Sequence, residues 1–298
     1  MSLRTQLSTA LLDRVAGPHG NRLRDRIHGT PGERWFDADA PIRRVHGDAS
    51  MFIGGLAALL LQSWHPRAMA AVAAHSGYRG DPWGRLQRTS AFLAVTAFGT
   101  AEHAGQATRA VREIHAGISG VSPEGERYAA SEPDLLLWVH VAEVHAFLTA
   151  HQRFGAHPLT AAESDLYVAL AARTARELGV LDPPESVREL RATLDRFLPE
   201  LRGSDAARDA ARFLLREPPL PVAARLPYRG LVLAGIGLLP RACRAPLGLP
   251  NRPGVDRWVA PVVGRTLTRT IRWALGAQPA PSAPPRFERG SVDVNRQL

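Results

Sequence analysis

The chain has 298 residues, of which 45% are hydrophobic and 22% are charged, as is typical of soluble globular proteins. A chain of this length forms one large domain or two average ones, and it can enclose a sizeable cavity. All 37 basic residues are Arg and the formal net charge is +9, but the Arg residues are scattered and mostly lie beside Asp or Glu. Because no basic stripe is interleaved with aromatic residues, the charge does not support nucleic-acid binding.

Cysteine content and hydropathy indicate a cellular location. Cys243 is the single cysteine, which excludes an internal disulfide and a thiolate metal cage and favours a reducing compartment. The longest apolar runs, residues 51–61 and 230–240, are shorter than the ~20 residues that cross a bilayer. The first residues lack the apolar segment of a signal peptide, since Asp13 and Arg14 interrupt them. We therefore expect a cytoplasmic protein without a transmembrane segment, for which peripheral membrane contact remains open.

Helical periodicity dominates the sequence, and alternating strand patterns are scarce. In chain order, helices are predicted over residues 51–62, 66–76, 85–99, 101–118, 132–155, 159–180, 184–201, 204–217, 229–245 and 256–276. Gly99 is a good helix end, Thr100 can cap the helix that follows, and Pro133 suits a first helical turn. Residues 77–84 and 121–131 are predicted as loops that are rich in Gly, Pro and Ser.

These elements predict an all-α fold with one multi-helix domain over residues 1–276. From residue 277 the composition becomes Pro-rich and polar, so residues 277–298 are predicted to be a disordered tail. Neither an internal linker of this kind nor an internal repeat divides the rest of the chain.

Several catalytic motifs are missing from the sequence. It has no Gly-rich phosphate loop, no His-Glu-x-x-His zinc helix and no nucleophile elbow. Di-iron bundles need Glu-x-x-His pairs on two helices, whereas here Val144 alone separates Glu143 from His145. The eleven His residues therefore become the main chemical resource. Among them, His65 is interpreted as a capping or packing group and His46 as a structural or surface residue of a polar N-terminal segment.

The stretch AVREIHAGISG, residues 110–120, places His115 one helical turn after Arg112 and among small residues. An imidazole that binds iron, with a guanidinium in reach of a carboxylate, suits a haem with its propionates. A structural role for this His is the alternative that spacing alone does not exclude.

One helix earlier, Arg85, Arg88 and Thr89 have the spacing i, i+3 and i+4 and project from one side. Two cations and a hydroxyl can position dioxygen, polarise a peroxide or bind propionates. In the structural alternative, which the spacing alone favours, the Arg residues contact the preceding loop and Asp81, and Thr89 bonds to the backbone.

The ordered blocks LLLQSWHP, HSGYRGDPWGRLQRTSAFLAVTAFG, AVREIHAGISG and GERYAASEPDLLLWVHVAEV resemble the latex-clearing-protein, or rubber oxygenase, superfamily. This superfamily also includes the fungal oxygenase that cleaves a prenyl side chain in mycophenolic acid biosynthesis and many actinobacterial proteins. The resemblance covers roughly residues 46–155 and continues more weakly to about residue 250.

The resemblance implies a haem-b protein with a globin-like helical core. The axial ligand of the iron falls on His115, with Arg112 one turn before it, and the distal group falls on Arg85, Arg88 and Thr89. Two departures stand out. Ser119 occupies a position that is often Arg in the family, and the distal Glu proposed as a base in rubber cleavage has no counterpart.

The block LLLWVH, residues 135–140, adds Trp138 and His140 as cofactor-binding candidates. Trp138 is interpreted mainly as a packing residue of the core or of the haem edge. For His140 three roles stand side by side: a bond to a propionate, support of His115, or a buried His that is satisfied by a carbonyl.

We therefore expect a haem-b-dependent oxidoreductase, an oxygenase that acts with dioxygen on an apolar small molecule such as an isoprenoid. His115 would bind the iron, and its second ring nitrogen would donate to a carbonyl or carboxylate. The alternatives are a haem-dependent dehydrogenase or peroxidase of the same family, a haem-binding sensor without turnover, and a cofactor-free helical interaction protein.

Overall fold

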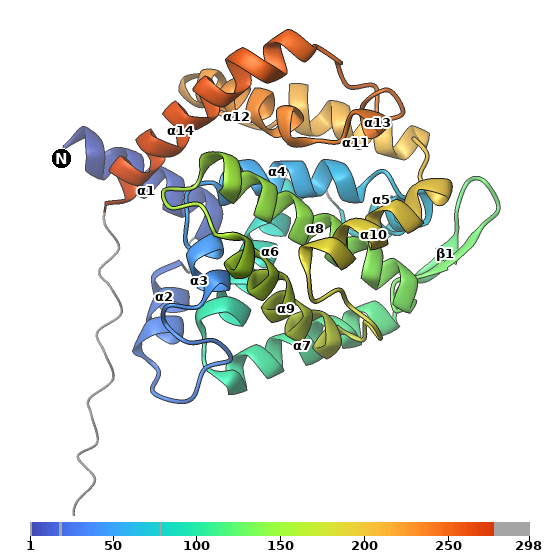
Figure 1. Ribbon diagram of the computed structural model, residues 1–298, viewed down its shortest axis with the longest axis horizontal. Coiled ribbons are helices and arrows are strands. Elements are labelled where there is room, and N and C mark those ends of the chain that lie inside the picture. Colours follow the sequence, from blue (N-terminus) through green and yellow to red (C-terminus); the bar gives the residue numbers. More distant parts are fainter. Residues whose placement is uncertain (1, 18–19, 78, 277–298) are drawn as a thin grey trace, which may run out of the picture.

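The computed structural model describes residues 2–17, 20–77 and 79–276, and this part of the chain is almost entirely helical (Figure 1). Its α-helices are α1 Leu3–Ala16, α2 Gly20–Gly29, α3 Pro41–His46, α4 Met51–Gln62, α5 Pro66–His75, α6 Pro82–Phe98, α7 Ala101–Ala116, α8 Pro133–Phe154, α9 Ala161–Leu178, α10 Val187–Phe197, α11 Asp205–Arg216, α12 Val222–Leu238, α13 Arg241–Arg244 and α14 Ala260–Leu275. The predicted all-α, single-domain fold is confirmed. The predicted tail, residues 277–298, lies outside the described residues.

The helices are arranged in layers around α4 and α8, which pack against each other at the centre (Figure 1). Their close approach depends on Gly54, because a Cβ atom there would lie 3.1 Å from both the Ala150 Cβ and the Phe147 Cδ1. On one side α12 and α14 cover this centre, and on the other side lie α6, α7 and α9.

The turn between α4 and α5 is anchored in the core by His65. This residue is the N-cap of α5, where its Nδ1 accepts a hydrogen bond from the backbone N–H of Ala68 at 3.5 Å, and Pro66 follows at the first helical position. Its ring also packs against the ring of Trp138, with 6.0 Å between the two ring centroids. The predicted capping and packing role of His65 is confirmed.

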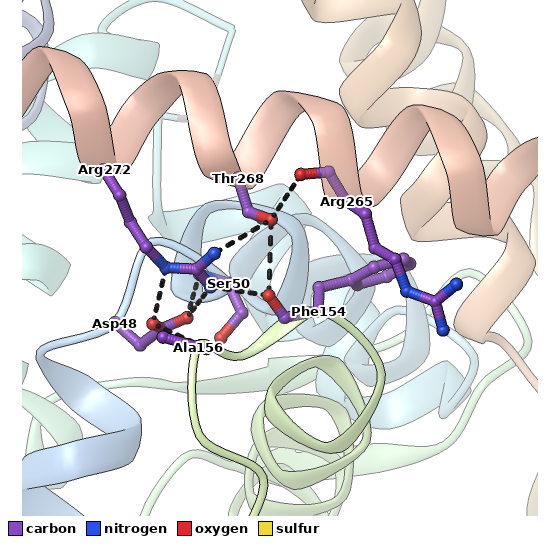
Figure 2. A network of polar contacts seen from close by, with 7 residues as sticks. All are labelled: Asp48, Ser50, Phe154, Ala156, Arg265, Thr268 and Arg272. Atoms are coloured by element: carbon purple, nitrogen blue, oxygen red, sulfur yellow. Dashed lines mark hydrogen bonds and ion pairs between the residues drawn. The ribbon is translucent and has the colours of Figure 1, made fainter.

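The last helix is tied to the first third of the chain by a polar network around Asp48 (Figure 2). The Asp48 carboxylate accepts hydrogen bonds from the Arg272 Nε and Nη2 at 2.9 and 2.8 Å and from the backbone N–H of Ser50 at 2.8 Å. Arg272 also donates to the carbonyl of Phe154 at 2.5 Å. Residues from α14, the end of α8 and the turn before α4 are thereby joined.

Four features differ from the sequence-based expectation. Helices α1, α2 and α3 precede the first predicted helix, and α7 ends two residues early at Ala116. A short antiparallel hairpin, β1 Ser119–Val121 with β2 Arg127–Ala129, lies in a region expected to be helix end and loop. Its turn has no Asn-Gly or Asp-Gly pair; instead, the Ser122 Oγ accepts from the N–H groups of Glu124 and Glu126. The predicted helix 229–245 is instead split between α12 and α13.

Candidate functional site

His115 is positioned by the last turn of α7. This helix begins at the N-cap Thr100, whose hydroxyl accepts from the N–H of His103 at 3.2 Å, and it ends at the cap Gly117. The His115 side chain is half-buried, and burial lowers its pKa, so the imidazole is neutral at pH 7. A neutral imidazole is the form that binds a metal.

A cavity of about 260 Å³ lies beside this imidazole. It is lined by Arg112, His115 and Ala116 of α7, Ser131 and Leu136 from the start of α8, and Leu178 and Gly179 from the end of α9. The structure therefore brings Arg112 and His115 together as the sequence predicted. The cavity combines one nitrogen donor and one cation with walls that are mainly apolar.

The second nitrogen of His115 does not have the partner that we expected. Its Nδ1 is buried without a hydrogen-bond partner, and no described residue supplies a carbonyl or carboxylate acceptor to it. The expected bond to a carbonyl or carboxylate is thus absent among the described residues, and its formation with a bound cofactor stays a prediction.

His140 lies one turn beyond Leu136 on α8, so both project from the same side of this helix. Burial, with a smaller contribution from Arg176, lowers the pKa of His140 to about 4. Its Nε2 is buried and, among the described residues, lacks a hydrogen-bond partner. The alternative in which a carbonyl satisfies this ring is therefore not supported.

A second group of polar side chains faces the interior next to His140: Glu143 of α8, Tyr167 of α9 and His46 of α3. The ring of His46 lies 6.1 Å from that of Tyr167, and burial lowers the pKa of His46 to about 4. The hydroxyl of Tyr167 is buried without a partner, and burial together with nearby Glu143 raises its pKa.

Glu143 is the most informative member of this group. It is half-buried by accessible surface, yet desolvation raises its pKa to about 7. Glu143 is therefore held in a desolvated setting that favours its protonated form. No hydrogen bond or ion pair in the described part of the chain engages it.

Sequence reasoning missed both Glu143 and His46. It considered Glu143 only as an iron ligand and gave His46 no role beyond that of a structural or surface residue. A usable signal was the i, i+3 spacing of His140 and Glu143 on an otherwise apolar helix. For His46 there was no local signal, since α8 and α9 are what enclose it.

The distal candidates lie at the start of α6. Asp81 caps this helix, and the Arg88 Nη1 forms an ion pair with its Oδ2 at 3.2 Å, while both side chains are exposed. The Arg85 Nη1 donates to the Ser76 Oγ at 2.9 Å. Thr89 is exposed, and the backbone bond expected for it in the structural alternative does not occur among the described residues. None of these three residues lines the cavity beside His115, and their catalytic role stays a prediction.

Trp138 projects from the other side of α8, away from His140. It is 0% exposed, donates through its Nε1 to the carbonyl of Gln62 at 3.0 Å, and packs on Phe197. The interpretation of Trp138 as a packing residue is confirmed for the core, and a contact with a cofactor stays a prediction.

Comparison with protein families matches residues 43–273 to the family described as "ER-bound oxygenase mpaB/B'/Rubber oxygenase, catalytic domain". The chain belongs to this oxygenase family. The match spans most of the chain and confirms the resemblance carried by the motifs. Comparison with curated proteins and with solved structures gives no match.

Membership makes this protein an oxygenase-like oxidoreductase, and it implies a small-molecule substrate and dioxygen. Among the described residues, helices of sufficient length and apolarity to span a bilayer do not occur.

The residues of the cavity fit the haem that the resemblance implies. A haem needs a neutral nitrogen donor, a cation for its carboxylates and an apolar surface. His115 has an unpartnered ring, Arg112 has no ion-pair partner among the described residues, and Leu136 and Leu178 supply apolar walls.

Proposed function

We propose that this protein is a haem-b-dependent oxygenase that acts on an apolar small molecule, such as an isoprenoid or another secondary metabolite. The observation that carries the proposal is the neutral, unpartnered imidazole of His115 beside a cavity that also holds the Arg112 guanidinium. Membership of an oxygenase family supports the reaction class.

In this proposal His115 holds the iron and Arg112 pairs with a propionate carboxylate. Bound haem would supply the oxidising chemistry, which the side chains of the protein do not provide. Leu136 and Leu178 exclude water from the site and offer an apolar surface to the substrate.

The buried polar side chains of α8 and α9 would handle protons. Glu143 holds its proton up to about neutral pH, so its carboxyl can give or take a proton near pH 7. His140 stays neutral under the same conditions and offers one donor and one acceptor. The Tyr167 hydroxyl is a further donor, for which the described residues supply no hydrogen-bond partner.

The first test is an absorption spectrum of protein produced with a haem supply. We expect a Soret band that is lost or shifted in His115→Ala and kept in His103→Ala. His103 is the matched control because it lies on the same helix and is also half-buried, with an unpartnered Nδ1. A colourless wild-type protein, or an unchanged band in His115→Ala, would refute the haem assignment.

The second test separates turnover from gas binding. We expect the ferrous protein to consume dioxygen when an apolar isoprenoid is added, with an oxygenated product detected by mass spectrometry. Reversible gas binding without consumption would favour a sensing role, and a desaturated product without inserted oxygen would favour a dehydrogenase.

A further inference from the structure

The C-terminal part of the chain has a charge very different from the rest. Residues 218–276 contain nine Arg and a single acidic residue, Asp256. The other 239 residues contain 28 Arg and 27 acidic residues, so nearly all of the +9 net charge lies in this one segment. Asp256 does not offset it at the surface, because it pairs with the buried Arg244.

The segment folds into an outer layer built from α12 and α14, along the edge of the molecule opposite α7 (Figure 1). The two helices are in close, antiparallel contact. A Cβ atom at Gly230 would lie 3.1 Å from the Val263 Cγ1, and one at Gly237 would lie 3.1 Å from the Ala260 Cβ. The positively charged segment therefore forms one continuous layer of the molecule.

Large apolar side chains are exposed on the same layer. Their exposed fractions lie between 52% and 76%, and they are Val222, Leu226, Trp258, Val262 and Trp273. Trp258 lies in the π-helical turn Val255–Val259, directly before α14. On α14, Val262, Arg269 and Trp273 follow one another at intervals of seven and four residues, which places them on one side of the helix. The accompanying exposed arginines are Arg225, Arg229, Arg257, Arg265 and Arg269. We call these ten residues the α12–α14 face.

A small polar cavity of about 160 Å³ lies at the border of this face, between α14 and the end of α8. Arg153, Arg265, Arg269 and Arg272 all line it. Asp48 neutralises Arg272, but no ion pair in the described part of the chain engages Arg265 or Arg269. In Figure 2 the Arg265 guanidinium points away from the Asp48 network. Burial is the main cause that lowers the pKa of Arg153, the nearby charge of Arg265 lowers it further, and Asp256 acts in the opposite direction.

From this arrangement we propose that the α12–α14 face docks on an anionic lipid bilayer, with a headgroup phosphate held by Arg265 and Arg269. Tryptophan and aliphatic side chains enter the boundary between headgroups and acyl chains, and Arg pairs with lipid phosphates. Since no helix of the described residues can span a bilayer, the contact is peripheral.

Other occupants explain the face less well. Nucleic acid would use the arginines but leaves Val222, Leu226 and Val262 in water. A second copy of the chain would bring two faces of the same positive charge together. An anionic bilayer satisfies both the charge and the apolar side chains.

The test is co-sedimentation of the full-length protein with vesicles of phosphatidylcholine alone and of an equal mixture with phosphatidylglycerol. We expect binding to the mixed vesicles that falls as salt is raised, and little binding to the neutral ones. Arg265→Gln with Arg269→Gln should weaken binding roughly thirtyfold. The matched control is Arg188→Gln with Arg191→Gln, an exposed pair on α10 that should leave binding unchanged.

A second pair of variants tests how deeply the exposed tryptophans enter the bilayer. Mixed vesicles containing brominated acyl chains should quench the wild-type tryptophan emission, and Trp258→Phe with Trp273→Phe should remove most of that quenching. Both positions are exposed, so far-UV circular dichroism should show an intact fold.

Several results would overturn the proposal: equal binding to both vesicle types, no binding, or an equal loss in the α10 control. Tighter binding to duplex DNA than to mixed vesicles would indicate a nucleic-acid surface, and a dimer that the arginine variants dissociate would indicate self-association. Complete displacement from vesicles by inorganic phosphate, with no effect of the tryptophan variants, would indicate a free-anion site.

Discussion

The desolvated carboxyl of Glu143 makes the stability of the fold depend on pH. Its pKa is raised from 4.5 to about 7 in the folded chain, so the fold favours the protonated carboxyl. The stabilisation from this group is fully present below pH 4.5 and is lost as the pH rises through 7. Its loss amounts to at most about 3 kcal/mol.

We therefore expect Glu143→Gln to be more stable than the wild type at pH 8 and similar to it at pH 4.5. Urea unfolding at a series of pH values measures this difference. Identical pH profiles for the two proteins would contradict an enclosed carboxyl at this position.

His140 changes the stability of the fold with pH in the direction opposite to Glu143. Its pKa is lowered from 6.5 to about 4, so the stability that it contributes is present above pH 6.5 and is lost as the pH falls through 4. In His140→Asn the loss of stability between pH 6.5 and 4 should shrink by roughly 2–3 kcal/mol. Thermal unfolding at these two pH values measures it, with the exposed His157→Asn as control. An equal change in both variants would show that burial of His140 is not the cause.

Individual site residues were predictable only where the signal is local. His115 and Arg112 lie one turn apart on one helix, so their spacing alone brought them together. His46 and Glu143 each come near Tyr167 through the packing of α3, α8 and α9, which no short stretch of sequence encodes. Arg88 was ambiguous because the ion pair with Asp81 and a role at a cofactor need the same side chain.

At the scale of elements, close helix packing depends on residues without side chains. Gly264 of α14 faces the ring of Phe154 at the end of α8, and a Cβ atom there would overlap that ring. Gly264→Ala should therefore lower the free energy of unfolding by about 1–3 kcal/mol, despite the better helix propensity of Ala.

Gly55→Ala on α4 is the matched control for this substitution. A Cβ atom at Gly55 has no neighbour within 4 Å, so the same change should stabilise the protein by up to about 1 kcal/mol. Chemical denaturation measures both variants. A neutral or stabilising Gly264→Ala would mean that the two helices can separate without loss.

Element boundaries were predictable to different degrees for physical reasons. The helix at residues 51–62 matches α4 because a dense apolar run ends at a distinct His-Pro turn. The start of α12 was missed because Pro227 lies inside the helix, where proline normally indicates an end. The hairpin after α7 was missed because its strands have only three residues each.

At the scale of the whole molecule, the Asp48 network holds distant parts of the chain together. Burial would raise the pKa of Asp48, but hydrogen bonds from Arg272 and Ser50 outweigh it, and the pKa is lowered. The stabilisation from this carboxylate is present above pH 3.8, and it is lost as the pH falls through the lowered pKa of Asp48 in the folded protein.

Asp48→Asn should reduce the free energy of unfolding by about 3 kcal/mol at pH 7, because it leaves Arg272 without its partner. Thermal unfolding is the measurement, and Asp205→Asn is the control, since Asp205 is fully exposed and pairs within α11. Equal effects of the two substitutions would mean that the network does not hold α14 in place.

The fold class was predictable from the periodicity of the whole chain, but its layers were not. Nothing local in α12 or α14 indicates that both lie on one face, and the arginines there seemed scattered along the sequence. Folding gathers their charge, so the surface property emerges only once the helices are packed.

The solvent-poor setting of the Glu143 carboxyl also has a spectroscopic consequence. A protonated carboxylic acid has a carbonyl stretch well separated from the bands of ionised carboxylates, and its frequency responds to every new hydrogen bond. Difference infrared spectra of the wild type and Glu143→Gln would thus isolate one vibration from a single interior position, a label-free reporter of molecules entering the protein.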